Sequence, residues 1–292
     1  MNVEGFSERP VFFPTEVGDL AGVLTVPTSA NGIGVLIPWG SSTAPSSGIN
    51  QVRAVLAREL ARAGFHAFRF DYPGVGESIG EYRRPEMATP FTAEVLGAAA
   101  WLGTQGLHRL AIVANCFGGW SSLMAAPRLD GLEGLFLVNP PVRRDHKEVR
   151  AAEEGLGWWL KNAKRFRIAK LRSSEYRAKY RKMLNAKRAS LTGDRRDQRF
   201  RRAVTHLIDR KVPLFIIYGD DDFRGDFEWE MANGLSELID AAGPPTRVVL
   251  VPERLAGFRD TAAHAMLLDE VLPWLVGLGD RRPEAVRLPQ ET

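Results

Sequence analysis

The segment around Cys116 constrains the fold more than any other part of this 292-residue chain. An apolar run over residues 110–113 is typical of a buried strand, and a helical pattern begins at Gly118. A strand that turns directly into a helix forces the residue at the bend into a strained backbone conformation. The residues two positions to either side must be small because chain segments crowd there, and Ala114 and Gly118 meet that demand. The sequence therefore predicts a sharp strand-to-helix turn that exposes the side chain of Cys116.

Short apolar runs alternate with amphipathic runs along most of the chain, which predicts a mostly parallel sheet with crossover helices. The expected strands are an opening antiparallel pair over 11–17 and 20–26, followed by 34–38, 66–70, 109–114, 134–139, 212–218 and 246–251. The expected helices cover 51–63, 91–102, 118–126 and 264–278. We therefore expect an α/β fold whose sheet has about eight strands, with helices on both faces.

The turn at Cys116 resembles the G-x-S-x-G nucleophile elbow of the α/β-hydrolase superfamily. Two positions depart from that pattern, because Ala114 replaces the first Gly and Cys116 replaces Ser. The run Phe70-Asp71-Tyr72-Pro73-Gly74-Val75-Gly76-Glu77-Ser78 is similar to the family's loop after its fourth strand. The resemblance covers nearly the whole chain and implies an α/β-hydrolase fold with Cys116 as its nucleophile. The alternative is that Cys116 is a small buried apolar residue, as free cysteines commonly are.

The resemblance also implies a general base. The family's chain order is nucleophile, acid and then histidine. Of the five histidines, only His264 lies beyond the last predicted strand, at the head of a predicted helix where the family places its base. We therefore expect His264 to be the base, the alternative being a surface histidine near a helix N-terminus.

The acid should follow the strand predicted over 212–218, where the sequence offers Gly219-Asp220-Asp221-Asp222. In many relatives the acid lies three residues after this glycine, which points to Asp222. Its role would be to accept the ring N–H of His264 and fix the tautomer. Asp221 is the alternative acid, and Asp220 and Asp221 can instead cap a turn or helix.

Two backbone N–H groups are expected to form an oxyanion hole. The resemblance places one at Phe117, directly after the nucleophile. The other should come from Trp39-Gly40-Ser41, the loop after the third strand, with the Trp39 N–H as the expected donor. Many relatives carry His-Gly at this point, so Trp39 is a departure, and the alternative is that Trp39 forms a wall of the pocket.

Positive charge is concentrated between residues 143 and 211, where 23 Lys/Arg face 8 Asp/Glu, whereas the rest of the chain has 16 against 27. This segment interrupts the strand–helix alternation, and we interpret it as a basic helical cap because a structureless loop of that length is unusual. The hydrolase core then comprises residues 1–142 and 212–280, and 281–292 forms a flexible tail. A basic cap would attract an anionic partner, such as coenzyme A, an acidic carrier protein or an acidic substrate. The alternative is a solvated face that only aids solubility.

Composition argues against several other classes of protein. The single cysteine allows no intramolecular disulfide, and no apolar run approaches the ~20 residues of a membrane span. With no signal peptide visible, we expect a cytoplasmic protein. Gly74-Val75-Gly76 lacks the third glycine and the helix entry of a dinucleotide fingerprint, so no nicotinamide, flavin or metal cofactor is implied. No nucleic-acid motif accompanies the basic segment, and the oligomeric state is left open.

These expectations combine into acyl-enzyme chemistry. A thiolate formed beside a histidine attacks a carbonyl, and the resulting acyl-thioester can pass its acyl group to water, an alcohol, an amine or a thiol. The chain resembles dienelactone-hydrolase-like enzymes and carrier-protein acyl shuttles or thioesterases, which use cysteine in this fold. We expect a thioesterase or acyltransferase that acts on an activated acyl group, with a thioester on coenzyme A or a carrier protein favoured. The alternatives are an ester or lactone hydrolase of the dienelactone type and a catalytically silent binding protein.

Overall fold

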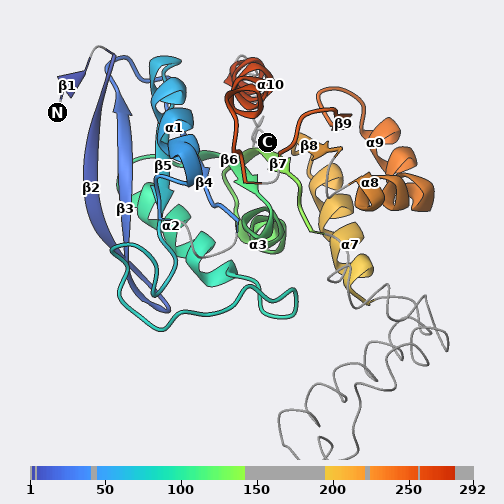
Figure 1. Ribbon diagram of the computed structural model, residues 1–292, viewed down its shortest axis with the longest axis horizontal. Coiled ribbons are helices and arrows are strands. Elements are labelled where there is room, and N and C mark those ends of the chain that lie inside the picture. Colours follow the sequence, from blue (N-terminus) through green and yellow to red (C-terminus); the bar gives the residue numbers. More distant parts are fainter. Residues whose placement is uncertain are drawn as a thin grey trace, which may run out of the picture. The chain divides into compact units, whose positions relative to one another are not determined.

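A computed structural model of the protein describes residues 2–3, 5–40, 45–141, 195–220, 224–255 and 257–279. Its described strands form one nine-stranded sheet in the order β1-β2-β3-β5-β4-β6-β7-β8-β9 (Figure 1). The strands are β1 (Asn2–Val3), β2 (Phe6–Thr15), β3 (Gly18–Pro27), β4 (Ile33–Ile37), β5 (His66–Phe70), β6 (Arg109–Asn115), β7 (Leu132–Val138), β8 (Leu214–Gly219) and β9 (Arg247–Val251). The eight predicted strands are all confirmed, and the two-residue β1 adds a ninth.

The predicted helices are confirmed within a few residues at each end. The described helices are η1 (Ile49–Gln51), α1 (Val52–Arg62), α2 (Thr92–Thr104), α3 (Phe117–Ala125), η2 (Ala126–Arg128), α7 (Arg195–Asp209), α8 (Arg224–Glu230), the π-helix η5 (Met231–Leu235), α9 (Ser236–Ala242) and α10 (Thr261–Gly279). The sequence pattern predicted no helix over 224–242, whereas α8, η5 and α9 occupy this stretch without a break.

The sheet changes direction once, and this change locates the site. β1, β2, β3 and β5 pair antiparallel with one another in that order, which confirms the predicted opening pair. From β5 onward, all the neighbouring strands are parallel. β4 lies between β5 and β6, so the chain moves to one side of β4 and later returns to the other side. In open parallel sheets, ligands bind at the carboxyl ends of the strands beside such a switch point.

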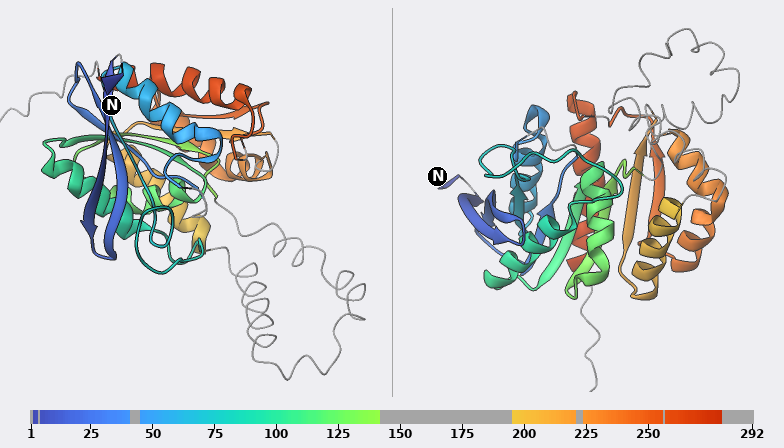
Figure 2. Two further views of the ribbon diagram at one scale, coloured as in Figure 1. Left: turned by 60° about the vertical axis from the view of Figure 1, so that its left-hand side comes forward. Right: turned by 90° about the horizontal axis from the view of Figure 1, so that it is seen from below.

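Helices cover both faces of the sheet, as predicted, with α1 and α10 on one face and α2 and α3 on the other (Figure 2). On the first face, the Trp274 ring of α10 packs against Phe136 of β7 and Phe215 of β8, at centroid distances of 5.7 and 6.2 Å. Burial of large apolar side chains of this kind is the main stabilising contribution to a fold. The core therefore fixes α10, which carries His264, against the central strands.

The basic segment is described only in part. The chain divides into two compact units, Met1–Pro140 with Ala203–Thr292, and Pro141–Arg202. Of the predicted cap over 143–211, only residues 195–211 are described, and the predicted tail over 281–292 lies outside the described residues. The last part of the predicted cap contacts η2 and the residue after it, because the Arg210 guanidinium donates to the carbonyls of Ala126 (3.2 Å) and Leu129 (2.9 Å). The remaining cap residues stay a prediction.

A buried arginine joins the ends of β4 and β5 at the switch point by hydrogen bonds. Arg53 of α1 is 2% exposed and donates to the carbonyls of Ile37 (3.1 Å) and Phe70 (2.6 Å). These are the last residues of β4 and β5. Burial lowers the pKa of Arg53 to about 10, which leaves the guanidinium charged at neutral pH. The loops that follow β4 and β5 therefore start from fixed points.

The first turn of α3 lies unusually close to the loop that follows β4. A Cβ added to Gly118 would lie 2.6 Å from the Pro38 carbonyl oxygen and 2.8 Å from the Trp39 nitrogen. A Cβ added to Gly119 would come no closer than 3.4 Å to the side chains of Leu137 and Pro140. The approach of α3 to this loop therefore requires glycine at 118, which explains the small residue at this position of the predicted turn.

We expect Gly118→Ala to lower the free energy of unfolding by about 1–3 kcal/mol, because its methyl group would force the backbone of the loop after β4 to move. Gly119→Ala in the same helix turn is the matched control. The methyl group of this variant would make only contacts of ordinary length, and alanine stabilises a helix relative to glycine by up to ~1 kcal/mol. Urea unfolding of both variants measures the difference, and equal stabilities would contradict the requirement for glycine at 118.

Candidate functional site

The predicted bend at Cys116 is present between β6 and α3. The backbone of Cys116 has φ 51° and ψ −127°, a conformation that non-glycine residues rarely adopt. Two hydrogen bonds hold it, because its N–H donates to the Val138 carbonyl (2.8 Å) and its carbonyl accepts from the Trp120 N–H (3.2 Å). Such strain persists only where neighbouring structure enforces it, and it is concentrated at functional sites.

Cys116 is half-buried, and the choice between a nucleophile and a small apolar residue stays a prediction. A Cβ placed on Gly40 would lie 3.2 Å from the Cys116 Cβ and 3.9 Å from its Sγ, so the loop after β4 directly adjoins the thiol. Burial raises the pKa of the Cys116 thiol, and a hydrogen bond from the Phe117 N–H partly opposes this rise. At neutral pH the substrate-free thiol is therefore protonated, and a base is needed to form the thiolate.

The two predicted oxyanion donors lie in different surroundings. A hydrogen bond from the Phe117 N–H lowers the pKa of the Cys116 thiol, and the role of this N–H as an oxyanion donor stays a prediction. Trp39 is 8% exposed, and its ring lies 5.4 Å from the Phe258 ring in the core, while its backbone nitrogen abuts Gly118. The Trp39 side chain therefore belongs to the hydrophobic core, and the role of its N–H stays a prediction. Ser41 lies outside the described residues.

His264 lies in the first turn of α10, beyond β9, as predicted. The His264 Nε2 is 3.1 Å from the Phe258 carbonyl oxygen, and the centroids of the His264 and Phe258 rings are 6.2 Å apart. A carbonyl oxygen only accepts hydrogen bonds, so Nε2 carries the hydrogen in this conformation. In the neutral ring, Nε2 can accept a proton only after this hydrogen bond breaks and the tautomer changes.

The loop before α10 is fixed from two directions. The Asn50 side-chain amide donates to the Arg259 carbonyl at 2.7 Å, and the Asp260 carboxylate caps the helix by accepting from the Ala263 N–H at 2.8 Å. Phe258, next to this loop, has a positive φ of 49° and is fully buried. These contacts hold the loop and the first turn of α10, in which His264 lies.

The segments that carry Cys116 and His264 converge on the loop after β4. Gly40 of this loop adjoins Cys116, and Trp39 packs on Phe258, whose carbonyl bonds His264. Both predicted residues thus lie at the carboxyl end of the sheet, around the switch point at β4. The pairing of Cys116 with His264 as nucleophile and base stays a prediction.

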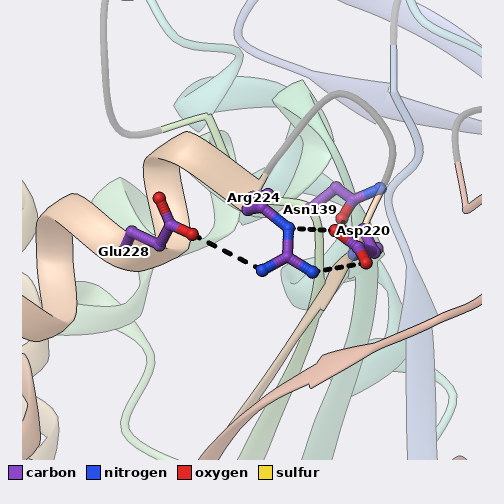
Figure 3. Close-up of polar contacts among 5 residues, drawn as sticks. Asn139, Asp220, Arg224 and Glu228 are labelled. Carbon is purple, nitrogen blue, oxygen red and sulfur yellow. Dashed lines mark hydrogen bonds and ion pairs between the residues drawn. The ribbon is translucent and has the colours of Figure 1, made fainter.

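Asp221 and Asp222, the two candidates for the acid, lie outside the described residues. Asp220 is described, and its carboxylate forms an ion pair with the Arg224 guanidinium, which also lies 3.5 Å from Glu228 (Figure 3). Arg224 holds the pKa of the Asp220 carboxyl below its usual range. Asp220 therefore pairs with the side chain of the first residue of α8. Its capping role and the choice between Asp221 and Asp222 stay predictions.

Sequence reasoning missed Asn139, which joins the ends of two strands. Asn139 directly follows β7, has a positive φ of 46° and is 1% exposed. Its Oδ1 accepts from the Gly219 N–H (2.8 Å), and its own N–H donates to the Ile217 carbonyl (2.8 Å). It thereby fixes the start of the segment that contains the three aspartates. The signal was an asparagine at the end of an apolar strand, just before two prolines.

A second group that sequence reasoning left without a role lies after β5 and on α2. Tyr72 is 4% exposed, and its hydroxyl has no hydrogen-bond partner among the described residues. Glu94 is fully buried, with one carboxylate oxygen paired with Arg83 and the other without a partner in the described part of the chain. Tyr72 stands in the loop that carried the family resemblance, so its position was visible in the sequence but its burial was not.

Two further properties concern the described residues alone. No three His, Cys, Asp or Glu side chains among them gather as a metal site would require. None of the helices within the described ranges is both long enough and apolar enough to cross a membrane.

Comparison with known proteins places the chain in a family. The profile of the Alpha/beta hydrolase family matches residues 35–284. An esterase from Pyrococcus furiosus has a similar structure, with TM-score 0.58, 14% identity and 94% of this chain and 91% of that chain covered. A dienelactone hydrolase from Anabaena variabilis is also similar, with TM-score 0.57, 16% identity and 94% and 99% covered. Comparison with curated protein sequences finds no significant match. At such low identities the structural likeness shows the fold alone, but the profile match spans most of the sequence, and the chain belongs to the alpha/beta hydrolase family.

Proposed function

We propose that the protein forms a covalent acyl intermediate on Cys116 and hydrolyses or transfers an activated acyl group. The observation that carries this proposal is the strained turn at Cys116, with φ 51° and ψ −127° between β6 and α3. In this family such a turn presents the nucleophile, and the next N–H forms part of the oxyanion hole. A half-buried cysteine with the Phe117 N–H beside its sulfur fits that arrangement.

In the proposed reaction, His264 takes the proton of the Cys116 thiol and the thiolate attacks the carbonyl carbon of the substrate. As the C–S bond forms, the electron pair of the C=O bond moves to oxygen, and the Phe117 and Trp39 N–H groups stabilise this oxyanion. Collapse of the intermediate expels the alkoxide or thiolate, which receives the proton from His264. Water or another acceptor then attacks the acyl-thioester and releases Cys116. Asp222 would orient the imidazole in both steps.

A thioester on coenzyme A or a carrier protein remains the favoured substrate class. Exchange between two thiols is nearly balanced in free energy, so a cysteine intermediate suits it, and the net positive segment 143–211 suits an anionic carrier. The competing substrate class is an ester or lactone. The similarity to a structure named dienelactone hydrolase, which concerns the fold, supports that class.

A catalytically silent binding protein is the second candidate function, and two features of the site favour it. The hydrogen bond from His264 Nε2 to the Phe258 carbonyl keeps this nitrogen from acting as a base, and burial raises the pKa of the Cys116 thiol. Both features describe the substrate-free protein. Apo enzymes often show loose or misaligned catalytic hydrogen bonds that tighten only when substrate binds. Covalent labelling separates the two functions.

We expect short-chain acyl thioesters and a p-nitrophenyl ester to add one acyl group to the protein, at Cys116. Cys116→Ala should abolish this adduct, and His264→Ala should slow its formation at neutral pH by ~100-fold or more, because the thiol then lacks its base. His108→Ala, which removes an exposed histidine before β6, is the matched control and should react as the wild type does. Intact-mass spectrometry measures the adduct. Equal rates for the His264 and His108 variants would argue against the assigned base.

The alkylation of the substrate-free protein should depend on pH. Because burial raises the pKa of the Cys116 thiol, its thiolate should form only at a pH above the ~8.5 of a free cysteine. The rate of alkylation by iodoacetamide should therefore be low at neutral pH and rise through a midpoint above that value. Alkylation rates measured at a series of pH values, with free cysteine as the reference, give this midpoint. A midpoint below that of free cysteine would contradict a thiol pKa raised by burial.

The acceptor distinguishes a hydrolase from a transferase. If the protein is a transferase, the isolated acyl-enzyme should persist in buffer and lose its acyl group when coenzyme A or a carrier-protein thiol is added, since a thiol exchanges with a thioester without loss of activation. Time-resolved intact mass follows the acyl-enzyme in each condition. Rapid loss of the acyl group to water alone would identify a hydrolase and reject a dedicated transferase.

A further inference from the structure

An asparagine just before α1 connects the loop after β4 to the segment that contacts His264. The Asn50 side-chain amide donates to the Arg259 carbonyl at 2.7 Å and, more weakly, to the Phe258 carbonyl at 3.4 Å. The His264 Nε2 lies 3.1 Å from that same Phe258 oxygen. A carbonyl oxygen has two lone pairs and can accept from both donors. One backbone carbonyl therefore lies between Asn50 and the candidate base.

Both segments that Asn50 joins contain residues in the left-handed backbone region. Asn50 has φ 49° and Gln51 has φ 58° in the first segment, and Phe258 has φ 49° in the second. Such angles are unfavourable for a residue with a large side chain, and they persist only where neighbouring structure enforces them. The hydrogen bonds from Asn50 are part of that structure for Phe258. Loss of the Asn50 amide should therefore allow the Phe258 carbonyl to turn away from His264.

Apolar packing fixes the Phe258 ring, whereas polar contacts orient its carbonyl. The ring is fully buried and lies 5.4 Å from the Trp39 ring, measured between centroids. Within the described ranges, the carbonyl contacts the Asn50 amide and the His264 Nε2. The ring can therefore keep its place in the core while the peptide group that follows it changes orientation.

The hydrogen bond to this carbonyl decides whether His264 can act as a base. A neutral imidazole carries one N–H, and in this conformation it lies on Nε2. In the proposed triad the other ring nitrogen donates to the acid, and Nε2 takes the proton of the thiol. Nε2 is therefore available to Cys116 only after it has left the Phe258 carbonyl.

We propose that Asn50 is a positioning residue that keeps the base inactive in the substrate-free protein, because it holds the Phe258 carbonyl against the His264 Nε2. Attack by Cys116 then requires this hydrogen bond to break, after which Nε2 accepts the thiol proton and leaves a thiolate. The contact would protect the cysteine from oxidation and alkylation while no substrate is bound. The inference rests on the proposed function, and it concerns when His264 acts on Cys116, not which acyl group is transferred.

A purely structural role for Asn50 is the competing explanation. Asparagine tolerates the left-handed region better than most residues, so it also suits the turn before α1 on conformational grounds alone. In that case its loss would lower stability or loosen the site, whether or not His264 is present. A positioning role makes the effect of Asn50 depend on His264, and a double-mutant cycle measures that dependence.

The test measures the rate of iodoacetamide alkylation of Cys116 at neutral pH in the substrate-free, full-length protein. The wild type and His264→Ala should react at nearly the same slow rate, because the base is held away from the thiol. Asn50→Gly permits the left-handed backbone but lacks the amide, and it should react about fivefold faster, as expected for the loss of one hydrogen bond. The double variant Asn50→Gly/His264→Ala should return to the slow rate.

Gln51→Gly is the matched control. Gln51 is the neighbouring left-handed residue, and its side chain makes no capping hydrogen bond, so this variant should react as the wild type does. Equal rates for Asn50→Gly and the wild type would overturn the proposal. So would an acceleration that persists without His264, because it would show a loosened site, or a wild type much faster than His264→Ala, because it would show an active base.

A second variant and a second measurement keep the test decisive if Asn50→Gly folds poorly. Asn50→Asp has the same shape but places a carboxylate against the two carbonyl oxygens, so it should also accelerate alkylation. NMR of protein with isotope-labelled histidine follows the His264 Nε2–H directly. Its exchange with water should be slow in the wild type and faster in both Asn50 variants, and unchanged exchange would reject the proposal.

Failure of the proposed function is a separate result. In that case the wild type forms no acyl adduct with any of the thioesters or esters, whatever the alkylation rates of the variants. A normal acyl adduct in the wild type, combined with unaltered alkylation of both Asn50 variants, would reject this inference alone.

Discussion

The backbone conformation of Cys116 is the constraint on which the rest of the site depends. A positive φ at a residue with a side chain costs ~1–3 kcal/mol and persists only where its surroundings enforce it. Here a hydrogen bond to Val138 on one side and the first turn of α3 on the other hold the bend. The close approach of Gly118 to the loop after β4 then brings that loop against the thiol. Strain, close packing and exposure of the sulfur are thus consequences of one turn.

Several buried polar side chains lie at or near the ends of the central strands. Arg53 and Asn139 use their side chains to join neighbouring strand ends through backbone groups, so they fix the edge of the sheet from which the loops depart. Tyr72 and Glu94 each keep a buried oxygen without a partner among the described residues. Arg53 Nε and Asn139 Nδ2 are likewise buried without a partner among the described residues, so each of these side chains is satisfied only in part.

Local sequence signals predicted much of this structure because the features they report are themselves local. The strand expected over 66–70 has the same bounds in the structure, and the bend at Cys116 follows from small residues two positions to either side. The helices over 224–242 escaped prediction, since α8 and α9 have seven residues each and a π-helical turn lies between them. Pieces so short display too few turns for a clear apolar period.

The sequence by itself determined the position of the strained turn, the alternation of strands and helices, and a histidine beyond the last strand. Only the tertiary structure decided that Trp39 packs on Phe258, that His264 bonds the Phe258 carbonyl, and that Tyr72 lies across the end of β4 from Cys116. The reason is that these contacts join residues brought together by the order β5-β4-β6 of the strands. No local pattern encodes such an order, because it follows from how the helices pack over the whole sheet.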